Sequence, residues 1–229
     1  MGGPLPGTGP EGGCGVVEEL HHRLIRIGLD ALAADFGFAL AGGYAIQAHN
    51  IVQRLSDDVD LFTAIDRRSE MPAATDRIVG AYELAGFQVE RGHCSDTYVR
   101  LQVTDLESGA TSKVELVAEF LQHGPVPSEL GPVLHRDDVA AGKMEALFTR
   151  AEARDFIDVD ALLGSGYTRG QLIHLAAQRD AGFDLAVLAE MFGSVGRFND
   201  RQFTVYGVDA ERVRGIRAQF ADWREELGE

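Results

Sequence analysis

The sequence has few cations, few cysteines and no long apolar run. Only 21 lysine and arginine residues stand against 36 aspartate and glutamate residues, so the formal net charge is −15. A protein that binds nucleic acid over its whole surface needs many cations to neutralise phosphates, and this composition excludes such a protein. Any contact with nucleic acid must therefore be local.

The two cysteines, Cys14 and Cys94, are too few for a framework of disulfides. No apolar run approaches the roughly 18 residues that a membrane-spanning helix needs. Residues 1–15 are rich in glycine and proline and lack the basic and apolar regions of a signal peptide, so we expect a flexible tail there. These absences favour a soluble, cytoplasmic protein with no membrane partner.

What is present is the composition of a globular protein, with 45% hydrophobic residues. Over residues 16–121 helical and strand patterns alternate, which predicts an α/β core. Three prolines and two glycines interrupt residues 122–132, which we interpret as a linker. Strand patterns nearly vanish over residues 133–229, so we expect a helical domain there. The predicted fold class is α+β.

Hydrophobic periodicity places the individual elements. Strands are expected over residues 38–41, 59–63, 87–90, 98–103 and 113–119. Helices are expected over residues 17–37, 44–50, 72–84, 137–150, from 153, from 169, 183–191 and 209–227. Thr168 with Gln171 forms a capping box at the start of one of these helices.

A glycine pair, Gly42-Gly43, lies between the first expected strand and the next helix. Glycines in such a turn allow a phosphate group to approach the backbone, and the amides of a helix start favour anions. Two glycines in a turn are more often conformational than functional. The pair therefore indicates a phosphate-binding site only in combination with the residues that follow.

Three carboxylates, Asp57, Asp58 and Asp60, stand within four residues at the start of the second strand. Alternate residues of a strand point to the same side, so Asp58 and Asp60 can bind one hard cation. Magnesium, or manganese, suits two carboxylates whose remaining coordination positions are filled by water and phosphate oxygens. The alternative is a solvated acidic strand end, and we assign Asp57 to it because it points the other way.

Glu115 is the natural third carboxylate of this site. The strand over residues 113–119 turns Val114 and Leu116 to one side and Glu115 to the other. There Glu115 could bind the metal or take a proton from an attacking hydroxyl. The alternative is a surface residue paired with Lys113.

Lys143, Arg150 and Arg154 are separated by seven and then four residues, so one continuous helix would present all three on one face. Cations aimed at the metal would bind a triphosphate and offset charge as pyrophosphate leaves. The alternative is a solvated helix face. Asp155 and Asp158 could orient these cations, bind the nucleotide or cap a helix, and the sequence does not separate these roles.

These motifs together resemble the AbiEii/AbiGii-type nucleotidyltransferase toxins, a branch of the DNA polymerase beta-like superfamily. The resemblance rests on four segments, namely residues 41–43, 54–62, 143–147 and 153–159. It departs from the commonest pattern at Gly43, where many relatives carry serine, and at Glu115, where an aspartate is frequent.

The resemblance implies a polymerase beta-like core with a mixed sheet, followed by a helical half. It implies magnesium at Asp58 and Asp60 and nucleotide contacts around Gly43, Lys143 and Asp155, in a cleft between the two halves. The remaining candidate nucleotide-binding residues are Gly42, Arg54, Ser56, Arg150, Arg154 and Asp158.

The expected function is that of the toxin of a type IV toxin–antitoxin pair, with a cognate antitoxin as partner. Such an enzyme would transfer a nucleoside monophosphate from a nucleoside triphosphate to an acceptor hydroxyl. Some relatives use the 3′ end of transfer RNA as the acceptor, which here requires one basic patch near the site. The candidates for this patch are Arg169, Arg179, Arg197, Arg201 and Arg214. The alternatives are a nucleotidyltransferase of small molecules such as aminoglycosides, and a protein that binds nucleotide or a partner without catalysis.

Overall fold

The computed structural model describes residues 12–228, and its centre is one mixed sheet of seven strands. The strand order is β3-β4-β5-β2-β1-β7-β6. Strand β2 runs parallel to β5, and β1 runs parallel to β7, while the other pairs are antiparallel. The strands are β1 (Ala39–Leu40), β2 (Val59–Ala64), β3 (Phe87–Cys94), β4 (Tyr98–Asp105), β5 (Thr111–Glu119), β6 (Val126–Ser128) and β7 (Gly131–Val133).

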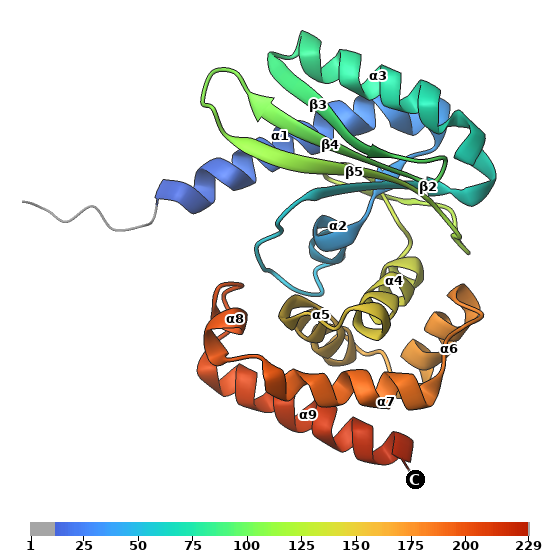
Figure 1. The fold of residues 1–229 in the computed structure, drawn as a ribbon, viewed down its shortest axis with the longest axis vertical. Coiled ribbons are helices and arrows are strands. Elements are labelled where there is room, and N and C mark those ends of the chain that lie inside the picture. Colours follow the sequence, from blue (N-terminus) through green and yellow to red (C-terminus); the bar gives the residue numbers. More distant parts are fainter. Residues whose placement is uncertain (1–11, 229) are drawn as a thin grey trace, which may run out of the picture.

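Period-two alternation gives the sheet one apolar face and one polar face. Val59 and Leu61 of β2, with Val114 and Leu116 of β5, are fully buried on the apolar face. Helices α1 (Gly12–Phe36) and α3 (Met71–Leu84) cover this face, as Figure 1 shows. The polar face turns Asp60 and Glu115 toward the other layer.

The second layer is helical and lies on the opposite side of the sheet (Figure 1). Helix α2 (Gly42–Ala48) and helix α4 (Arg136–Thr149) lie next to the sheet, and α5 (Ala153–Gly164) packs on α4. An aromatic cluster that includes Phe156, Phe192, Phe220 and Trp223 fills the core of this half. The outer elements are α6 (Arg169–Arg179), α7 (Leu185–Gly193), η2 (Ser194–Arg197), α8 (Asp200–Thr204) and α9 (Ala210–Gly228), and a 3-10 turn, η1 (Ile65–Glu70), follows β2.

The expected α+β class, with a mixed sheet followed by a helical half, is confirmed. The capping box at the start of α6 is present as well, because Thr168 accepts from Gln171 N–H and the Gln171 side chain accepts in return. Among the described residues, none of the helices combines the length and the apolar character that a membrane span needs.

Two local expectations differ from the structure. Helix α1 begins at Gly12, so the last residues of the expected tail are helical, while residues 1–11 lie outside the described part. Once a helix is nucleated, each further residue adds a hydrogen bond, and this offsets the poor helix propensity of glycine.

The other difference concerns the stretch over residues 122–132, which we expected to be a plain linker. Here β6 and β7 form a hairpin that joins the sheet through the pairing of Leu40 with Val133. Prolines fit because Pro127 lies in β6, an edge strand with no neighbour on its outer side. The division of the chain into two domains at this stretch stays a prediction.

Candidate active site

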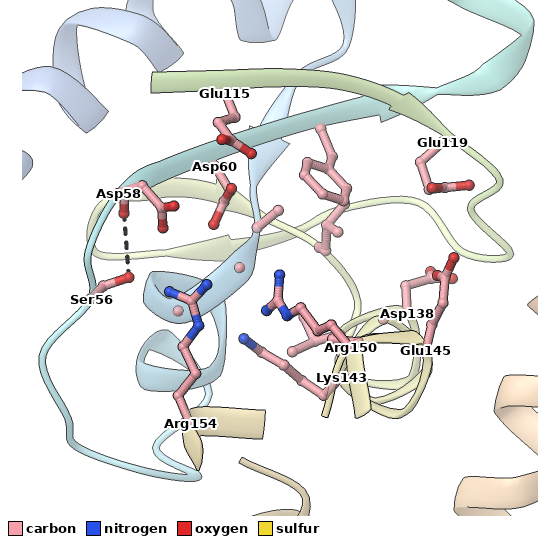
Figure 2. A pocket seen from close by; sticks show the side chains of 18 of the residues that line it. Ser56, Asp58, Asp60, Glu115, Glu119, Asp138, Lys143, Glu145, Arg150 and Arg154 are labelled. Atoms are coloured by element: carbon pink, nitrogen blue, oxygen red, sulfur yellow. Dashed lines mark hydrogen bonds between the residues drawn. The ribbon is translucent and has the colours of Figure 1, made fainter. Parts of the chain in front are cut away.

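A cavity of about 260 Å³ lies between the polar face of the sheet and the helical layer. Figure 2 shows carboxylates on the side of the sheet and cations reaching in from the helices. The main lining residues are Gly42, Gly43, Arg54, Ser56, Asp58, Asp60, Phe62, Glu115, Glu119, Lys143, Glu145, Arg150, Arg154 and Arg179. The cavity therefore draws on both halves of the chain.

Three carboxylates converge at one end of the cavity. Parallel pairing of β2 with β5 sets Asp60 directly beside Glu115, and Asp58 precedes β2 on the same side. Each of Asp58, Asp60 and Glu115 offers an oxygen within 4.8 Å of those of the other two. Glu115 pairs with Arg100 rather than with Lys113, at 3.0 Å from its Nε. A single hard cation fits these oxygens.

The electrostatics of this trio also favour a cation. Burial raises the pKa of Asp60 to about 7, and the charges of Asp58 and Glu115 add to the rise, while Lys143 opposes it. Burial likewise raises the pKa of Asp58, with Glu115 and Asp57 adding to it and Arg154 opposing it. Like charges held together in a partly desolvated site are unfavourable until a counter-charge arrives.

Gly42 is required by the approach of the backbone to Asp60. Its φ of +58° lies in the left-handed region, and a Cβ at this position would overlap the Asp60 carboxylate. The N–H of Ala41 donates to the carbonyl oxygen of Asp60 at 2.9 Å, which fixes the glycine turn to β2. Any side chain at position 42 would therefore displace the carboxylate.

Gly43 is matched by Ser56 on the neighbouring loop. A Cβ at position 43 would collide with the Ser56 hydroxyl, so Gly43 leaves room for this side chain. Ser56 is buried and donates weakly to the carbonyl oxygen of Asp58, at 3.3 Å. Both residues line the cavity beside Asp58.

On the helical side, Asp158 anchors two cations. Its side chain is fully buried and accepts from Arg54 Nε and Nη2 at 2.6 and 2.7 Å. Lys143 Nζ lies 2.8 Å from the same carboxylate. Burial alone would raise the pKa of Asp158, but Lys143 and Arg54 hold that pKa below its ordinary value. Asp158 therefore orients Lys143 and lies behind the cavity wall.

Asp155 has the same relation to Arg150. It is fully buried and binds the guanidinium through both oxygens, at 3.0 and 2.9 Å. It also accepts the backbone N–H of Glu152 in a capping box at the start of α5. These hydrogen bonds raise the pKa of Arg150 above its ordinary value. Two of the roles left open by the sequence, orienting a cation and capping the helix, are combined in this residue.

Lys143, Arg150 and Arg154 share the cavity, but not through one continuous helix. Helix α4 ends at Thr149, Ala151 has a φ of +48°, and α5 begins at Ala153. Because of this break, Arg150 and Arg154 reach the cavity from the bend between α4 and α5. The two helices expected over residues 137–150 and from residue 153 are present, and the three side chains line the same cavity without sharing one helix.

Asp57, which we assigned to a solvated strand end, has a defined partner. It accepts from Arg154 Nη1 at 2.5 Å and from the Tyr206 hydroxyl at 3.4 Å. Its side chain is half exposed, whereas that of Arg154 is only 18% exposed. Asp57 therefore ties the loop before β2 to the helical half beside the carboxylate trio.

Sequence reasoning missed a second polar group at the far end of the cavity. Arg179, at the end of α6, pairs with Glu119 of β5 and with Glu145 of α4. Glu119 follows Glu115 by four residues on the same strand face, so the alternation contained a signal for it. The position of Arg179 depends on the packing of α6 against α4, which no local pattern reveals.

The arginines proposed for a basic patch do not gather at the cavity. Arg179 lines it, whereas Arg169 pairs with Asp222 and Glu226 of α9. Arg201 belongs to α8, which lies at the opposite end of the helical half from α6 in Figure 1. Of the five candidates, only Arg179 lines the cavity, so they do not form one basic patch there.

The chain matches one known family model and has the fold of a solved structure. The family model described as nucleotidyl transferase AbiEii toxin, type IV toxin–antitoxin system, matches residues 24–229. JHP933 from Helicobacter pylori has a similar structure, with a TM-score of 0.53 and 17% identity over 93% of each chain. MenT4, a nucleotidyltransferase toxin from Mycobacterium tuberculosis H37Rv, has a TM-score of 0.49 and 18% identity over 80% of this chain and 66% of its own. No curated protein matches the sequence.

Proposed function

Because the chain belongs to the AbiEii family of nucleotidyltransferase toxins of type IV toxin–antitoxin systems, we propose that it transfers a nucleoside monophosphate from a nucleoside triphosphate to an acceptor hydroxyl. The observation that carries this proposal is the division of one cavity into a carboxylate side and a cation side. Such a division suits a metal–triphosphate complex, in which positive and negative charge lie side by side.

Asp58, Asp60 and Glu115 fit a magnesium or manganese ion. Their oxygens are close together, hard and partly buried, and burial together with the charges of Asp58 and Glu115 raises the pKa of Asp60, an effect that a bound cation would oppose. When bound, the ion would neutralise phosphate oxygens and the developing charge of the reaction. Gly42 supports the arrangement, because its lack of a side chain leaves room for the Asp60 carboxylate.

Lys143, Arg150 and Arg154 are proposed to hold the triphosphate. Phosphate oxygens are bound well by guanidinium groups that are already oriented, since less side-chain entropy is then lost. Asp158 and Asp155 supply this orientation to Lys143 and Arg150. We regard both aspartates as positioning residues that do not contact the nucleotide.

The chemical step joins an acceptor oxygen to the α-phosphorus and releases pyrophosphate. Glu115 is the proposed base, which takes the proton of the acceptor hydroxyl as the new P–O bond forms. Lys143 and Arg150 stabilise the charge that collects on the leaving pyrophosphate. The acceptor would approach from the side of β4, where Arg100 lies opposite Glu115 and is half exposed.

For the partner we propose a cognate antitoxin, from the family's type IV toxin–antitoxin role. For the acceptor we propose an RNA 3′ end, which is the acceptor that some proteins with similar motifs use. With the candidate arginines dispersed, contact with such an RNA would be confined to the mouth of the cavity. A short 3′ end, rather than a long duplex, suits so small a basic surface.

The test uses purified protein with magnesium, each nucleoside triphosphate and total RNA. Label from the α-phosphate should enter RNA, and label from the γ-phosphate should not. Asp60→Asn should abolish transfer and any toxicity on expression, while Asp96→Asn, at an exposed turn, should retain both. Equal labelling by wild type and Asp60→Asn, or no labelling of any acceptor, would refute the proposal.

A further inference from the structure

The end of the cavity away from the metal carboxylates has its own polar group. Arg179 Nε donates to Glu145 Oε2 at 2.6 Å, and Arg179 Nη2 lies 3.2 Å from Glu119 Oε2. The Arg179 side chain is only 5% exposed, while about a third of each glutamate side chain is exposed. Figure 2 shows Glu119 and Glu145 together, across the cavity from Asp58. We call these three residues the Glu–Arg–Glu bridge.

Strand geometry sets the distance between the two ends. On the polar face, β2 and β5 pair Asp60 with Glu115, then Phe62 with Val117, then Ala64 with Glu119. Four residues along a strand span about 13 Å. A nucleotide with its phosphates at the metal end would therefore extend past the Phe62 ring toward the bridge. Phe62 lines the cavity and offers an aromatic surface to a base.

Charge gives the nucleotide one direction. The cations not held by the bridge, Lys143 and Arg150, reach into the middle of the cavity, and Arg154 lies beside Asp58 (Figure 2). At the bridge, two carboxylates outnumber one guanidinium, which repels a triphosphate. If the proposed function holds, the triphosphate lies at the metal end, and the base lies at the bridge.

We propose that the Glu–Arg–Glu bridge reads the base and selects cytosine and adenine over uracil. Glu145 Oε1 has no protein partner within residues 12–228 and can accept an amino N–H. Arg179 can donate to the adjacent ring nitrogen, as the edges of cytosine and adenine require. Uracil presents a carbonyl oxygen in place of the amino group, which faces the carboxylate unfavourably.

Other nearby residues support this assignment of roles. Asp138, the third carboxylate at this end, already accepts from the backbone N–H groups of Gln122 and His123 with its two oxygens. Gly142 of α4 lies beside the guanidinium of Arg179, at a distance where a Cβ would make an ordinary van der Waals contact of 3.8 Å. The open acceptor of Glu145 and its guanidinium neighbour are thus held in place before any nucleotide binds.

The experiment compares binding of magnesium–CTP and magnesium–UTP to the full chain by calorimetry. The two nucleotides share the triphosphate and sugar and differ at the reading edge of the base. We expect the wild type to bind CTP about tenfold or more tightly, the usual effect of one hydrogen bond to a charged group. Glu145→Gln should bring the ratio close to one, because its amide can face either base. Glu83→Gln, on α3 and exposed, should leave the ratio unchanged.

Comparing ratios cancels the general effect of removing a negative charge near the triphosphate. Equal binding of CTP and UTP by the wild type would overturn the proposal and leave the transferase function standing, as would an unchanged ratio in a folded Glu145→Gln protein. Glu119→Gln, which loosens Arg179 without touching the reading carboxylate, should reduce the ratio partially. Absence of binding by all four nucleoside triphosphates would overturn both proposals.

Discussion

The two sides of the cavity each carry a pair of aspartates, and the pairs differ in what neutralises them. Asp58 and Asp60, on the sheet side, have raised pKa values because burial and like charges oppose their ionisation. Asp158, on the helical side, is fully buried, whereas Asp58 and Asp60 are only partly buried, yet Lys143 and Arg54 hold the pKa of Asp158 below its ordinary value. Burial alone therefore does not distinguish a candidate metal ligand from an aspartate that orients cations. The charged groups that contact the carboxylate make that distinction.

The opposite pKa shifts separate two kinds of aspartate that look the same in the sequence. A carboxylate whose pKa is raised by burial and like charges is a candidate metal ligand, whereas one that protein cations bind orients those cations. Asp155, which binds Arg150 through both oxygens, belongs with Asp158. The comparison can be tested by removing one charge at a time.

The largest expected effect is on catalysis by Asp60→Asn. The amide keeps the shape of the side chain but removes the charge that would bind the metal. We expect a loss in transfer rate of about a thousandfold or more, the scale of losing a group that acts directly on the reacting atoms. The rate of α-phosphate transfer into RNA measures it, and Asp96→Asn is the control. Retention of a tenth of the activity would place Asp60 outside the metal site.

Next in size is the effect of Asp158→Asn on stability. Without this charge, Arg54 and Lys143 remain buried without a counter-ion, which costs about 3–5 kcal/mol in free energy of unfolding. Urea unfolding measures the change. Asp160→Asn, on the same helix, is the control, because burial raises the pKa of Asp160 and its charge contributes less. If Asp158→Asn unfolded at the same urea concentration as wild type, the charge of Asp158 would not stabilise the fold.

Local patterns predicted the elements and the alternation that puts Asp58, Asp60 and Glu115 on one polar face. They did not predict that β2 and β5 are neighbours, which is the pairing that brings Asp60 beside Glu115. Strand order depends on how the apolar faces pack across the whole sheet, so the pattern of a single segment does not predict it.

The residues that position the side chains of the site were harder to predict than those side chains themselves. Arg54 and Asp158 are 104 residues apart and meet only because α5 packs beneath the loop before β2. Prolines in residues 122–132 suggested a linker, although an edge hairpin tolerates them. Arg179 could not be assigned to the cavity before α6 was placed on α4.

A smaller effect is expected for Asp155→Asn on nucleotide binding. Asparagine can still cap α5, so the change mainly releases the Arg150 guanidinium from its bidentate partner. We expect the Kd for magnesium–triphosphate to rise about tenfold, since an unrestrained side chain loses more entropy on binding. Glu211→Gln, at an exposed position at the start of α9, should leave the Kd unchanged. An unchanged Kd in Asp155→Asn would show that Arg150 does not need its anchor.

The smallest expected effect is on thermal stability and depends on pH. Asp60 has a folded-state pKa of about 7 and an unfolded value near 3.8. The folded protein therefore binds the extra proton between these values, and the associated stability is lost as pH rises from about 4 through 7. Asp60→Asn carries no such charge, so without metal it should melt above the wild type at pH 8, by roughly 2–4 °C for each kcal/mol relieved, and by a smaller margin at pH 5. Magnesium should raise the wild-type melting temperature at pH 8 and leave that of Asp60→Asn nearly unchanged. If the difference in melting temperature between the two proteins were the same at pH 5 and pH 8, the folded-state pKa of Asp60 would not be raised.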